Sequence, residues 1–255
     1  MDNNNSQIDM KGRRILVTGA SSGIGRETAI AISRSGGKVL GVGRRQSELE
    51  STLSQLDGEG HRVESFDLTD VDSIPAWLQG LAKEFGQFDG LAHMAGILES
   101  RPLKVSDAAF VDNILKVNVG TSIGLARGFR HKKVRAKSSS IVFASSVAAL
   151  IGEGGISAYS ASKGAIISLT QALASELARE GIRVNCVSPA VVQTEMTERF
   201  HKTLLTEQQE SVRSQHLLGL GSPPDVSALI VFLLSDLARW MTGSNVVIDG
   251  GYSTK

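Results

Sequence analysis

The sequence predicts an α/β protein: a doubly wound parallel sheet of seven strands, with helices on both faces, in a single domain. Short apolar runs alternate along the chain with longer amphipathic segments, and the connections between them are short, as is typical of this fold class. The chain has 255 residues, 41% of them hydrophobic, and 27 glycines, which suits helices packed closely on a sheet through tight turns. We expect residues 1–10 to form a disordered tail and residues 11–255 to form the domain.

Composition excludes several classes of function. The formal net charge is +1, so no global field attracts nucleic acid or a membrane surface. The single cysteine excludes an internal disulfide framework, and the five histidines form no cluster with metal-ligand spacing, so no metal is expected. No apolar run reaches the roughly 20 residues that span a bilayer, and the polar start lacks the layout of a signal peptide. We therefore expect a cytoplasmic protein.

The first predicted strand, residues 13–18, leads into the glycine-rich string TGASSGIG and then into a helix over 27–36. Glycine lets the backbone approach a pyrophosphate closely, and a helix N-terminus favours negative charge. The glycines are Gly19, Gly23 and Gly25, with the spacing G-x3-G-x-G. This segment is a candidate site for dinucleotide phosphates.

The second predicted strand, residues 38–45, ends in Gly43, Arg44 and Arg45. In such a fold the residue that reads the cofactor's ribose is expected here. A carboxylate would accept a hydrogen bond from the 2′-hydroxyl of NAD, whereas two guanidinium groups and no carboxylate suit the 2′-phosphate of NADP. The alternative is a solvated basic turn. The residues favour NADP.

A long helix is predicted over 107–133, beginning at Asp107, a good N-cap. It ends in the basic run RGFRHKKVRAK, which is read first as a solvated helix end and second as a docking patch for an acidic carrier. Residues 193–216 are predicted to form one or two short helices on a mobile loop, and the family resemblance described below implies that this loop is a substrate lid. The other predicted elements are strands within 61–70, 88–97, 141–145, 181–190 and 242–253, and helices over 71–86, 158–180 and 222–236.

Ser146, Tyr159 and Lys163 are the candidate catalytic residues. Tyr159 and Lys163 lie four residues apart at the start of a predicted helix and therefore share a face. A nearby cation lowers the pKa of a phenol from its ordinary ~10, so this tyrosine can exchange a proton with a substrate oxygen near neutral pH. Ser146, which follows the apolar run IVFAS, can hold that oxygen. Alone, a tyrosine and a lysine at this spacing are usually a surface pair; a serine at the end of the preceding strand makes the pattern much rarer.

This Ser–Tyr–Lys pattern, together with TGASSGIG, resembles the classical short-chain dehydrogenase/reductase family over about residues 11–253, with a broad similarity to its 3-oxoacyl-carrier-protein reductases. The resemblance implies a Rossmann-type fold that binds a nicotinamide cofactor. It also implies a catalytic tetrad completed by Asn118, at which the helix is kinked and whose main-chain carbonyl holds a water that contacts the lysine. The cofactor-binding residues that it implies are Gly19, Ser21, Ser22, Gly23, Ile24, Gly25, Arg44, Arg45, Asp67, Leu68, Ala95, Gly96, Tyr159, Lys163, Pro189, Val192 and Thr194.

The chain departs from the family pattern at two places. Relatives carry Asn-Asn-Ala-Gly where this chain has His93-Met94-Ala95-Gly96, and the asparagines usually brace the central sheet. We expect His93 to be a hydrogen-bonded core residue rather than a catalyst. Relatives also usually have Pro-Gly where this chain has Pro189-Ala190.

The function implied is reversible hydride transfer between NADP(H) and a carbon bearing oxygen, which interconverts a ketone and a secondary alcohol. A 3-oxoacyl-carrier-protein reductase is one option, although Glu180 stands where carrier-protein readers tend to be basic. The alternatives are an alcohol dehydrogenase for a sugar, steroid or secondary metabolite and, least favoured, an NADP-binding protein without turnover. Relatives pair the helices corresponding to 107–133 and 158–180 across two-fold axes, so a homotetramer is expected, with a dimer as the fallback.

Overall fold

The computed structural model describes residues 8–201 and 206–254 and confirms the predicted fold class. Seven parallel strands form one sheet in the order β3-β2-β1-β4-β5-β6-β7. The strands are β1 (Arg14–Thr18), β2 (Lys38–Gly43), β3 (Arg62–Ser65), β4 (Phe88–His93), β5 (Arg135–Ala144), β6 (Ile182–Pro189) and β7 (Asn245–Ile248).

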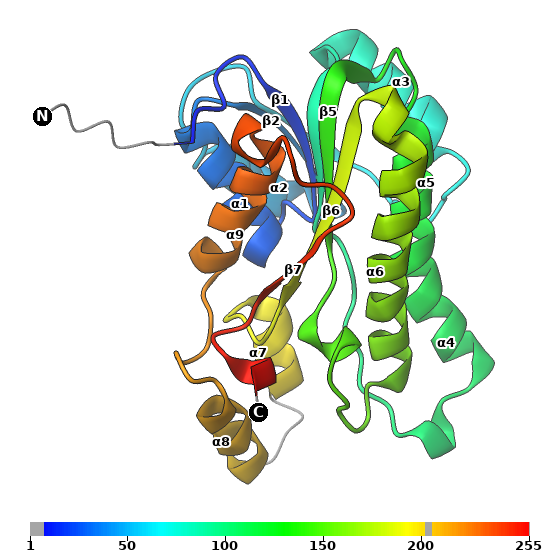
Figure 1. Cartoon of the computed structure of the whole chain (residues 1–255), viewed down its shortest axis with the longest axis vertical. Helices are drawn as coiled ribbons and strands as arrows, with labels where there is room; N and C mark the ends of the chain where they lie inside the picture. Colours follow the sequence, from blue (N-terminus) through cyan, green and yellow to red (C-terminus); the bar gives the residue numbers. More distant parts are fainter. Residues whose placement is uncertain (1–7, 202–205, 255) are drawn as a thin grey trace, which may run out of the picture.

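Helices cover both faces of the sheet (Figure 1). One face carries α1 (Gly23–Arg34), α2 (Gln46–Leu53) and α9 (Pro223–Leu234). The other carries α3 (Ile74–Phe85), α4 (Ala108–Leu115), α5 (Thr121–Phe129) and α6 (Ser157–Leu177). Successive residues of β1 enter different cores, Leu16 on the α3–α6 side and Ile15 and Val17 on the α1–α9 side, because side chains alternate across a strand.

The strand order reverses between β1 and β4. The chain builds outward from β1 through β2 to β3 and then returns to place β4 on the other side of β1. Ligands of open α/β sheets bind where the order reverses, beyond the carboxyl ends of the strands. Thr18 and His93 end the two strands in register and therefore mark this point. The helices α7 (Glu195–His201) and α8 (Thr206–Gln215) lie beyond the same end of the sheet (Figure 1).

The structure differs from the predictions at the N-terminal tail, at one helix that was missed and within the helix over 107–133. The expected disordered tail is wrong at its inner end, because Met10 is fully buried and its amide bonds the Ser35 carbonyl, while residues 1–7 lie outside the described part of the chain. The helix α2 was not predicted. The single helix over 107–133 is instead α4, a π-helical turn (Lys116–Gly120) and α5; Asp107 does cap α4, accepting a hydrogen bond from the amide of Phe110.

Candidate functional site

The glycine-rich turn joins β1 to α1 and leaves the start of that helix open. Gly19 has φ 71°, and a Cβ on it would lie 2.8 Å from the Ala95 amide nitrogen, so only glycine fits here. The N-cap residue Ser22 makes no side-chain capping hydrogen bond, and the first turn of α1 holds no acidic residue. Its amides are therefore available to an anion, and the helix dipole favours one. This donor set fits the pyrophosphate of a dinucleotide.

The end of β2 adjoins this turn. A Cβ on Gly43 would lie 3.3 Å from the Ser21 hydroxyl, so the two predicted cofactor segments meet. Arg45 forms an ion pair with Glu195 of α7, with 3.5 Å between Nη2 and Oε2. Arg44 makes no ion pair within the described residues. The two cations that follow β2 fit a phosphate group on the ribose.

The loop after β3 holds two further residues of the predicted cofactor site, Asp67 and Leu68. Asp67 accepts a hydrogen bond from the amide of Thr69 at 3.0 Å. That bond, with a smaller contribution from the charge of Arg44, holds the pKa of Asp67 below its ordinary value. Leu68, which the resemblance also implies to be a cofactor-binding residue, is buried in the core beside it. Asp67 is therefore an anionic acceptor close to the arginine that follows β2.

Ala95 and Gly96 follow β4 on the other side of the reversal point. The Ala95 amide faces the Thr18 hydroxyl at 3.4 Å. A Cβ on Gly96 would approach Asn118 Oδ1 to 3.1 Å and Lys163 Nζ to 3.5 Å. The missing side chain at 96 thus leaves room next to two of the predicted catalytic residues.

Ser146, Tyr159 and Lys163 come together where β5 ends and α6 begins. Ser146 caps the short 3-10 turn Val147–Ala149 by accepting a hydrogen bond from the Ala148 amide at 3.2 Å. Lys163 Nζ donates to the Ala144 carbonyl at 2.9 Å and lies 5.6 Å from the centre of the Tyr159 ring. The Ser145 hydroxyl donates to the Lys163 carbonyl at 2.8 Å, which fixes α6 to the end of β5.

Burial controls the protonation of both groups. It raises the pKa of Tyr159 to about 12, against a hydrogen bond with Ser146 that lowers it; the charge of Glu153 adds to the rise. Burial lowers the pKa of Lys163 to about 8, which still leaves the ammonium form predominant at neutral pH. The expectation that Lys163 lowers the pKa of Tyr159 is therefore wrong for this structure, in which desolvation dominates and the ammonium is bonded to a carbonyl. The phenol is protonated at neutral pH and can act as a proton donor.

Asn118 lies within the π-helical turn, a feature found frequently at functional sites. Its side-chain oxygen accepts from the Ile97 amide at 2.9 Å, and its amide nitrogen donates to the Ile97 carbonyl and the Ser162 hydroxyl, both at 3.0 Å. The side chain thus links the loop after β4 to α6. The main-chain carbonyl of Asn118 accepts a hydrogen bond from the Ser122 hydroxyl at 2.9 Å, a partner that the sequence did not suggest.

His93 is a hydrogen-bonded core residue, as predicted. Its Nδ1 lies 2.6 Å from the Thr18 hydroxyl and its Nε2 lies 3.1 Å from the Thr121 hydroxyl. Thr121 donates its own hydrogen to the Val117 carbonyl, so it accepts from Nε2, and Nδ1 accepts from Thr18. Burial, and secondarily the charge of Lys163, lowers the pKa of His93 to about 3. The neutral ring therefore joins β1, β4 and α5.

The end of β6 and the segment after it hold the last three predicted cofactor-binding residues, Pro189, Val192 and Thr194. Pro189 ends the strand, and Val192 pairs with Gly221 in an isolated bridge. Thr194 lies against the start of α1: a Cβ on Gly23 would come within 3.1 Å of its methyl carbon. The turn itself is held by Thr197, whose hydroxyl donates to the Val192 carbonyl at 2.6 Å.

His216 is a second buried histidine, which the sequence analysis did not identify. Its Nε2 accepts from the Val191 amide at 3.3 Å, its Nδ1 donates to the Val212 carbonyl at 2.7 Å, and its ring stacks on Tyr252. It therefore joins the segment after β6, the helix α8 and the C-terminal end of the chain. The sequence around it has neither strand alternation nor an apolar helical stripe, so no pattern marked it.

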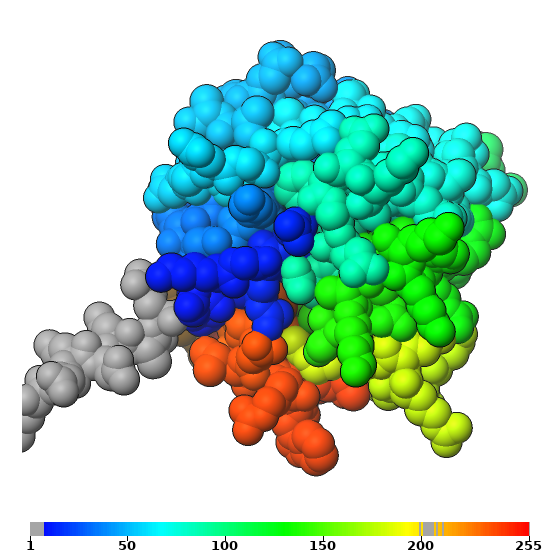
Figure 2. Space-filling view, turned by 90° about the horizontal axis from the view of Figure 1, so that it is seen from above, coloured from blue at the N-terminus to red at the C-terminus, as the bar shows by residue number. Residues whose placement is uncertain are grey.

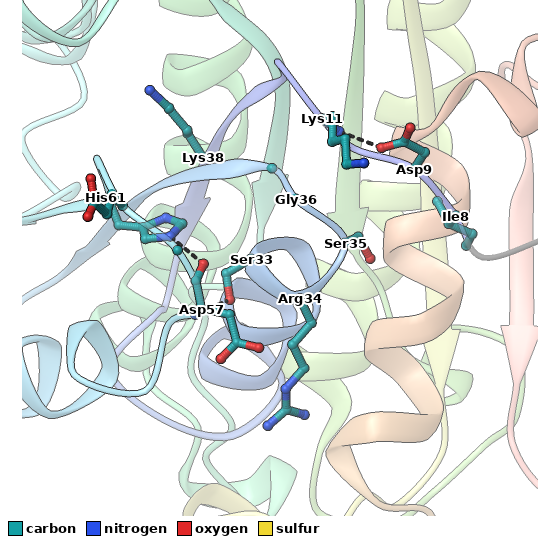
Figure 3. A pocket seen from close by; sticks show the side chains of 13 residues that line it. Ile8, Asp9, Lys11, Ser33, Arg34, Ser35, Gly36, Lys38, Asp57 and His61 are labelled. Carbon is teal, nitrogen blue, oxygen red and sulfur yellow. Dashed lines mark hydrogen bonds between the residues drawn. The ribbon is translucent and has the colours of Figure 1, made fainter.

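A separate cavity of about 470 Å³ lies at the opposite end of the sheet, where β1 and β2 begin. Its walls carry charges of both signs, including Arg34, Lys38 and Asp57, and His61 bonds the Asp57 carbonyl across it (Figure 3). Figure 2 looks down on that end, where the blue, green, yellow and orange segments leading into several strands meet. None of the predicted site residues lines this cavity.

Comparison with known proteins identifies the family. The family model described as enoyl-(acyl carrier protein) reductase matches residues 19–253. The chain is 31% identical over 245 residues to a 3-oxoacyl-(acyl-carrier-protein) reductase FabG of Thermotoga maritima (95% of this chain, 98% of the relative). It is 32% identical to a D-threitol dehydrogenase of Mycolicibacterium smegmatis (96% and 95%). The structure of a candidate NAD(P)-dependent gluconate 5-dehydrogenase of Beutenbergia cavernae, with NADP at low occupancy, aligns with a TM-score of 0.88 at 30% identity (98% and 100%).

The fold and the site together define a Rossmann-fold oxidoreductase that uses a nicotinamide cofactor on CH–OH groups. The chain belongs to the short-chain dehydrogenase/reductase family. Among the residues that the structure describes, no helix is long and apolar enough to cross a bilayer. In the same part of the chain, no three histidine, cysteine or carboxylate side chains are grouped so that they could hold a metal ion.

Proposed function

We propose that this protein is an NADP(H)-dependent oxidoreductase that interconverts a ketone and a secondary alcohol, with Asn118, Ser146, Tyr159 and Lys163 as its catalytic residues. The observation that carries the proposal is the gathering of Ser146, Tyr159 and Lys163 at the end of β5, with Gly96 leaving space beside the ammonium. The open N-terminus of α1 lies at the same end of the sheet. A single domain over residues 11–255, with 193–216 as its substrate lid, is part of the proposal.

In reduction, the residues of this chain position the substrate and supply the proton. The cofactor supplies a hydride to the carbonyl carbon. Ser146 holds the carbonyl oxygen, and Tyr159, protonated at neutral pH, donates its proton to that oxygen. Lys163 is mainly an ammonium at this pH; held by the Ala144 carbonyl at the end of β5, it binds the nicotinamide ribose. Asn118 supports the path by which Tyr159 regains a proton from solvent.

The cofactor preference is proposed from the end of β2. NADP(H) adds a phosphate at the ribose, and a charge-assisted hydrogen bond to such a group is worth roughly 1.5–3 kcal/mol. At about 1.4 kcal/mol per factor of ten, one arginine contact favours NADPH by roughly ten- to a hundredfold. Arg44→Ala should raise the KM for NADPH and leave that for NADH nearly unchanged. A wild-type enzyme with a higher kcat/KM for NADH contradicts the preference.

The structure favours a free small-molecule substrate over a carrier-bound one. The basic run predicted as a possible docking patch is partly neutralised within the chain: Arg130 pairs with Glu176 and Glu180, and Arg135 also reaches Glu180. Arg135 begins β5 and Ser146 follows its far end, and strands rise about 3.3 Å per residue, so the run lies on the order of 30 Å from the reacting groups. A carrier seated there is poorly placed to deliver its substrate.

We propose Glu153, an exposed residue, as an acceptor for a hydroxylated substrate. The charge of Glu153 raises the pKa of both Tyr159 and Tyr252, so this carboxylate lies near both phenols. A carboxylate accepts hydrogen bonds from hydroxyl groups. We therefore place a sugar- or polyol-type alcohol first among the substrate classes, the 3-oxoacyl thioester of a carrier second, and a steroid or other secondary metabolite third.

One assay tests the function directly. A panel of ketones and alcohols, containing polyols, sugar acids, a 3-oxoacyl thioester and a steroid, is followed at the absorbance of NADPH. We expect turnover with at least one ketone or secondary alcohol, and the loss of that turnover in Tyr159→Phe. Turnover that persists in this variant contradicts the proposed chemistry, and a preference for the thioester reverses the substrate order.

A homotetramer is the proposed assembly, with a dimer as the fallback. Leu115 of α4 and Ile123 of α5 are exposed on the helices expected to pair. A second set of exposed apolar side chains, Leu237, Trp240 and Val247, lies on and near the edge strand β7. Two separate apolar surfaces suit two two-fold axes. Light scattering that reports a monomer at micromolar concentration contradicts this assembly.

A further inference from the structure

The two arginines that follow β2 have different surroundings. Within the described residues, Arg44 makes no ion pair and acts electrostatically on Asp67. Arg45 is paired with Glu195, and the side chains are 44% and 43% exposed, so neither charge is locked in a buried geometry. The pair connects the first residue of α7 with the N-cap residue of α2, two elements far apart in the sequence.

Glu195 reaches this position because α7 begins against the phosphate-binding turn. Thr194, the preceding residue, packs on Gly23 at the start of α1, and its carbonyl accepts the Glu198 amide at 2.9 Å to begin the helix. An acidic residue in the first turn of a helix is stabilised by the helix dipole, which alone explains a glutamate here. Glu198 occupies the same turn and serves that purpose equally, however, without being paired to Arg45.

A carboxylate at this position opposes a 2′-phosphate in two ways. It occupies one face of the guanidinium that the phosphate needs, and it repels a group of about two negative charges. NAD(H) carries a free 2′-hydroxyl and experiences neither effect. The energy of the opposition is limited, because ion pairs between exposed side chains are weak.

We propose that Glu195 is a specificity-determining residue of the cofactor site, supplied by the lid, which competes with the 2′-phosphate of NADP(H) for Arg45. Binding of the phosphorylated cofactor breaks the Arg45–Glu195 pair and frees the start of α7 from the end of β2, whereas NAD(H) leaves the pair in place. The inference rests on the proposed binding of NADP(H) at Arg44 and Arg45. It assigns those two residues separate tasks: Arg44 contacts the 2′-phosphate without a competitor, whereas Arg45 binds either the phosphate or Glu195.

Binding without turnover tests the inference. Isothermal titration gives the dissociation constants of NADP⁺ and NAD⁺, which differ only in the 2′-phosphate, for the full-length protein and for Glu195→Gln. We expect this variant to bind NADP⁺ about two- to fivefold more tightly, the range set by an exposed ion pair, and to bind NAD⁺ as the wild type does. Glu198→Gln is the matched control: it removes the same charge from the same helical turn and should leave both constants unchanged.

A double-variant comparison identifies the partner. In an Arg45→Gln background, Glu195→Gln should lose most of its effect on NADP⁺ binding. An unchanged or reduced ratio of NADP⁺ to NAD⁺ affinity in Glu195→Gln overturns the inference, as does an equal gain in Glu198→Gln. A wild type that binds NAD⁺ more tightly overturns the proposed cofactor preference instead; a rise in the ratio on removing Glu195 still supports the role given to this residue.

Discussion

Because of His93, the folded protein should lose stability at acid pH, independently of any effect on catalysis. The folded protein keeps this ring neutral down to a pKa of about 3, whereas the ordinary value is 6.5. Between these two values the unfolded chain binds a proton that the folded protein does not, so the free energy of unfolding falls as the pH falls. At about 1.4 kcal/mol per pH unit, the step from pH 6.5 to pH 5 costs about 2 kcal/mol, and the whole window about 5 kcal/mol.

The measurement is urea-induced unfolding of the wild type and of His93→Asn at pH 7 and pH 5. His93→Asn is expected to be less stable at pH 7, because an asparagine does not reproduce both bonds to Thr18 and Thr121. Its stability relative to the wild type should then improve by about 2 kcal/mol at pH 5. Thr121→Val keeps the titrating ring and should therefore still lose stability between pH 7 and pH 5. If the difference between wild type and His93→Asn is the same at both pH values, the ring does not titrate as described.

Three further predictions concern the catalytic groups and the lid. Tyr159→Phe should lower kcat by at least about a hundredfold, the usual minimum for a general acid, with the NADPH dissociation constant nearly unchanged; a kcat within a few-fold of wild type refutes its role. Between pH 8 and pH 10.5 the folded wild type has released the Lys163 proton that the unfolded chain still holds, so its free energy of unfolding should rise by about 3 kcal/mol. Lys163→Met should lack this rise. Unfolding curves with the same pH dependence in both proteins contradict this. Residues 193–216, of which 202–205 lie outside the described chain, should exchange amide hydrogens quickly in the free enzyme and slowly with cofactor and substrate bound; equal rates would mean a fixed wall.

Local patterns in the sequence were enough to predict much of the fold and to choose the candidate site. TGASSGIG carries its own conformational requirement, since Gly19 needs a positive φ and an approach that no side chain allows. Tyr159 and Lys163 share a face because helical periodicity requires it. Asp107 was recognisable as an N-cap from its residue type, and in the structure its side chain accepts a hydrogen bond from the amide three residues on.

Features that depend on distant parts of the chain were not predictable. The helix α2 has only a short and largely polar sequence, QSELESTL, and it forms because Leu49 is fully buried against the sheet. The π-helical turn in KVNVG reads as an uninterrupted helix from its apolar period alone, and only the family resemblance implied a kink at Asn118. The pKa of Tyr159 follows from desolvation, which no spacing reveals. The Arg45–Glu195 pair requires the start of α7 to return to the end of β2.

The strand order also constrains how the chain folds. The first strand to be synthesised, β1, is an inner strand, and one of its partners, β4, pairs with it across a separation of 75 residues, as between Thr18 and His93. Parallel sheets with such long-range pairing fold slowly, because loop closure must precede the contacts that stabilise it. Until β7 has emerged, moreover, β6 is an unpaired and largely apolar edge. A chain cut before residue 245 is therefore expected to aggregate rather than to fold into a smaller soluble enzyme.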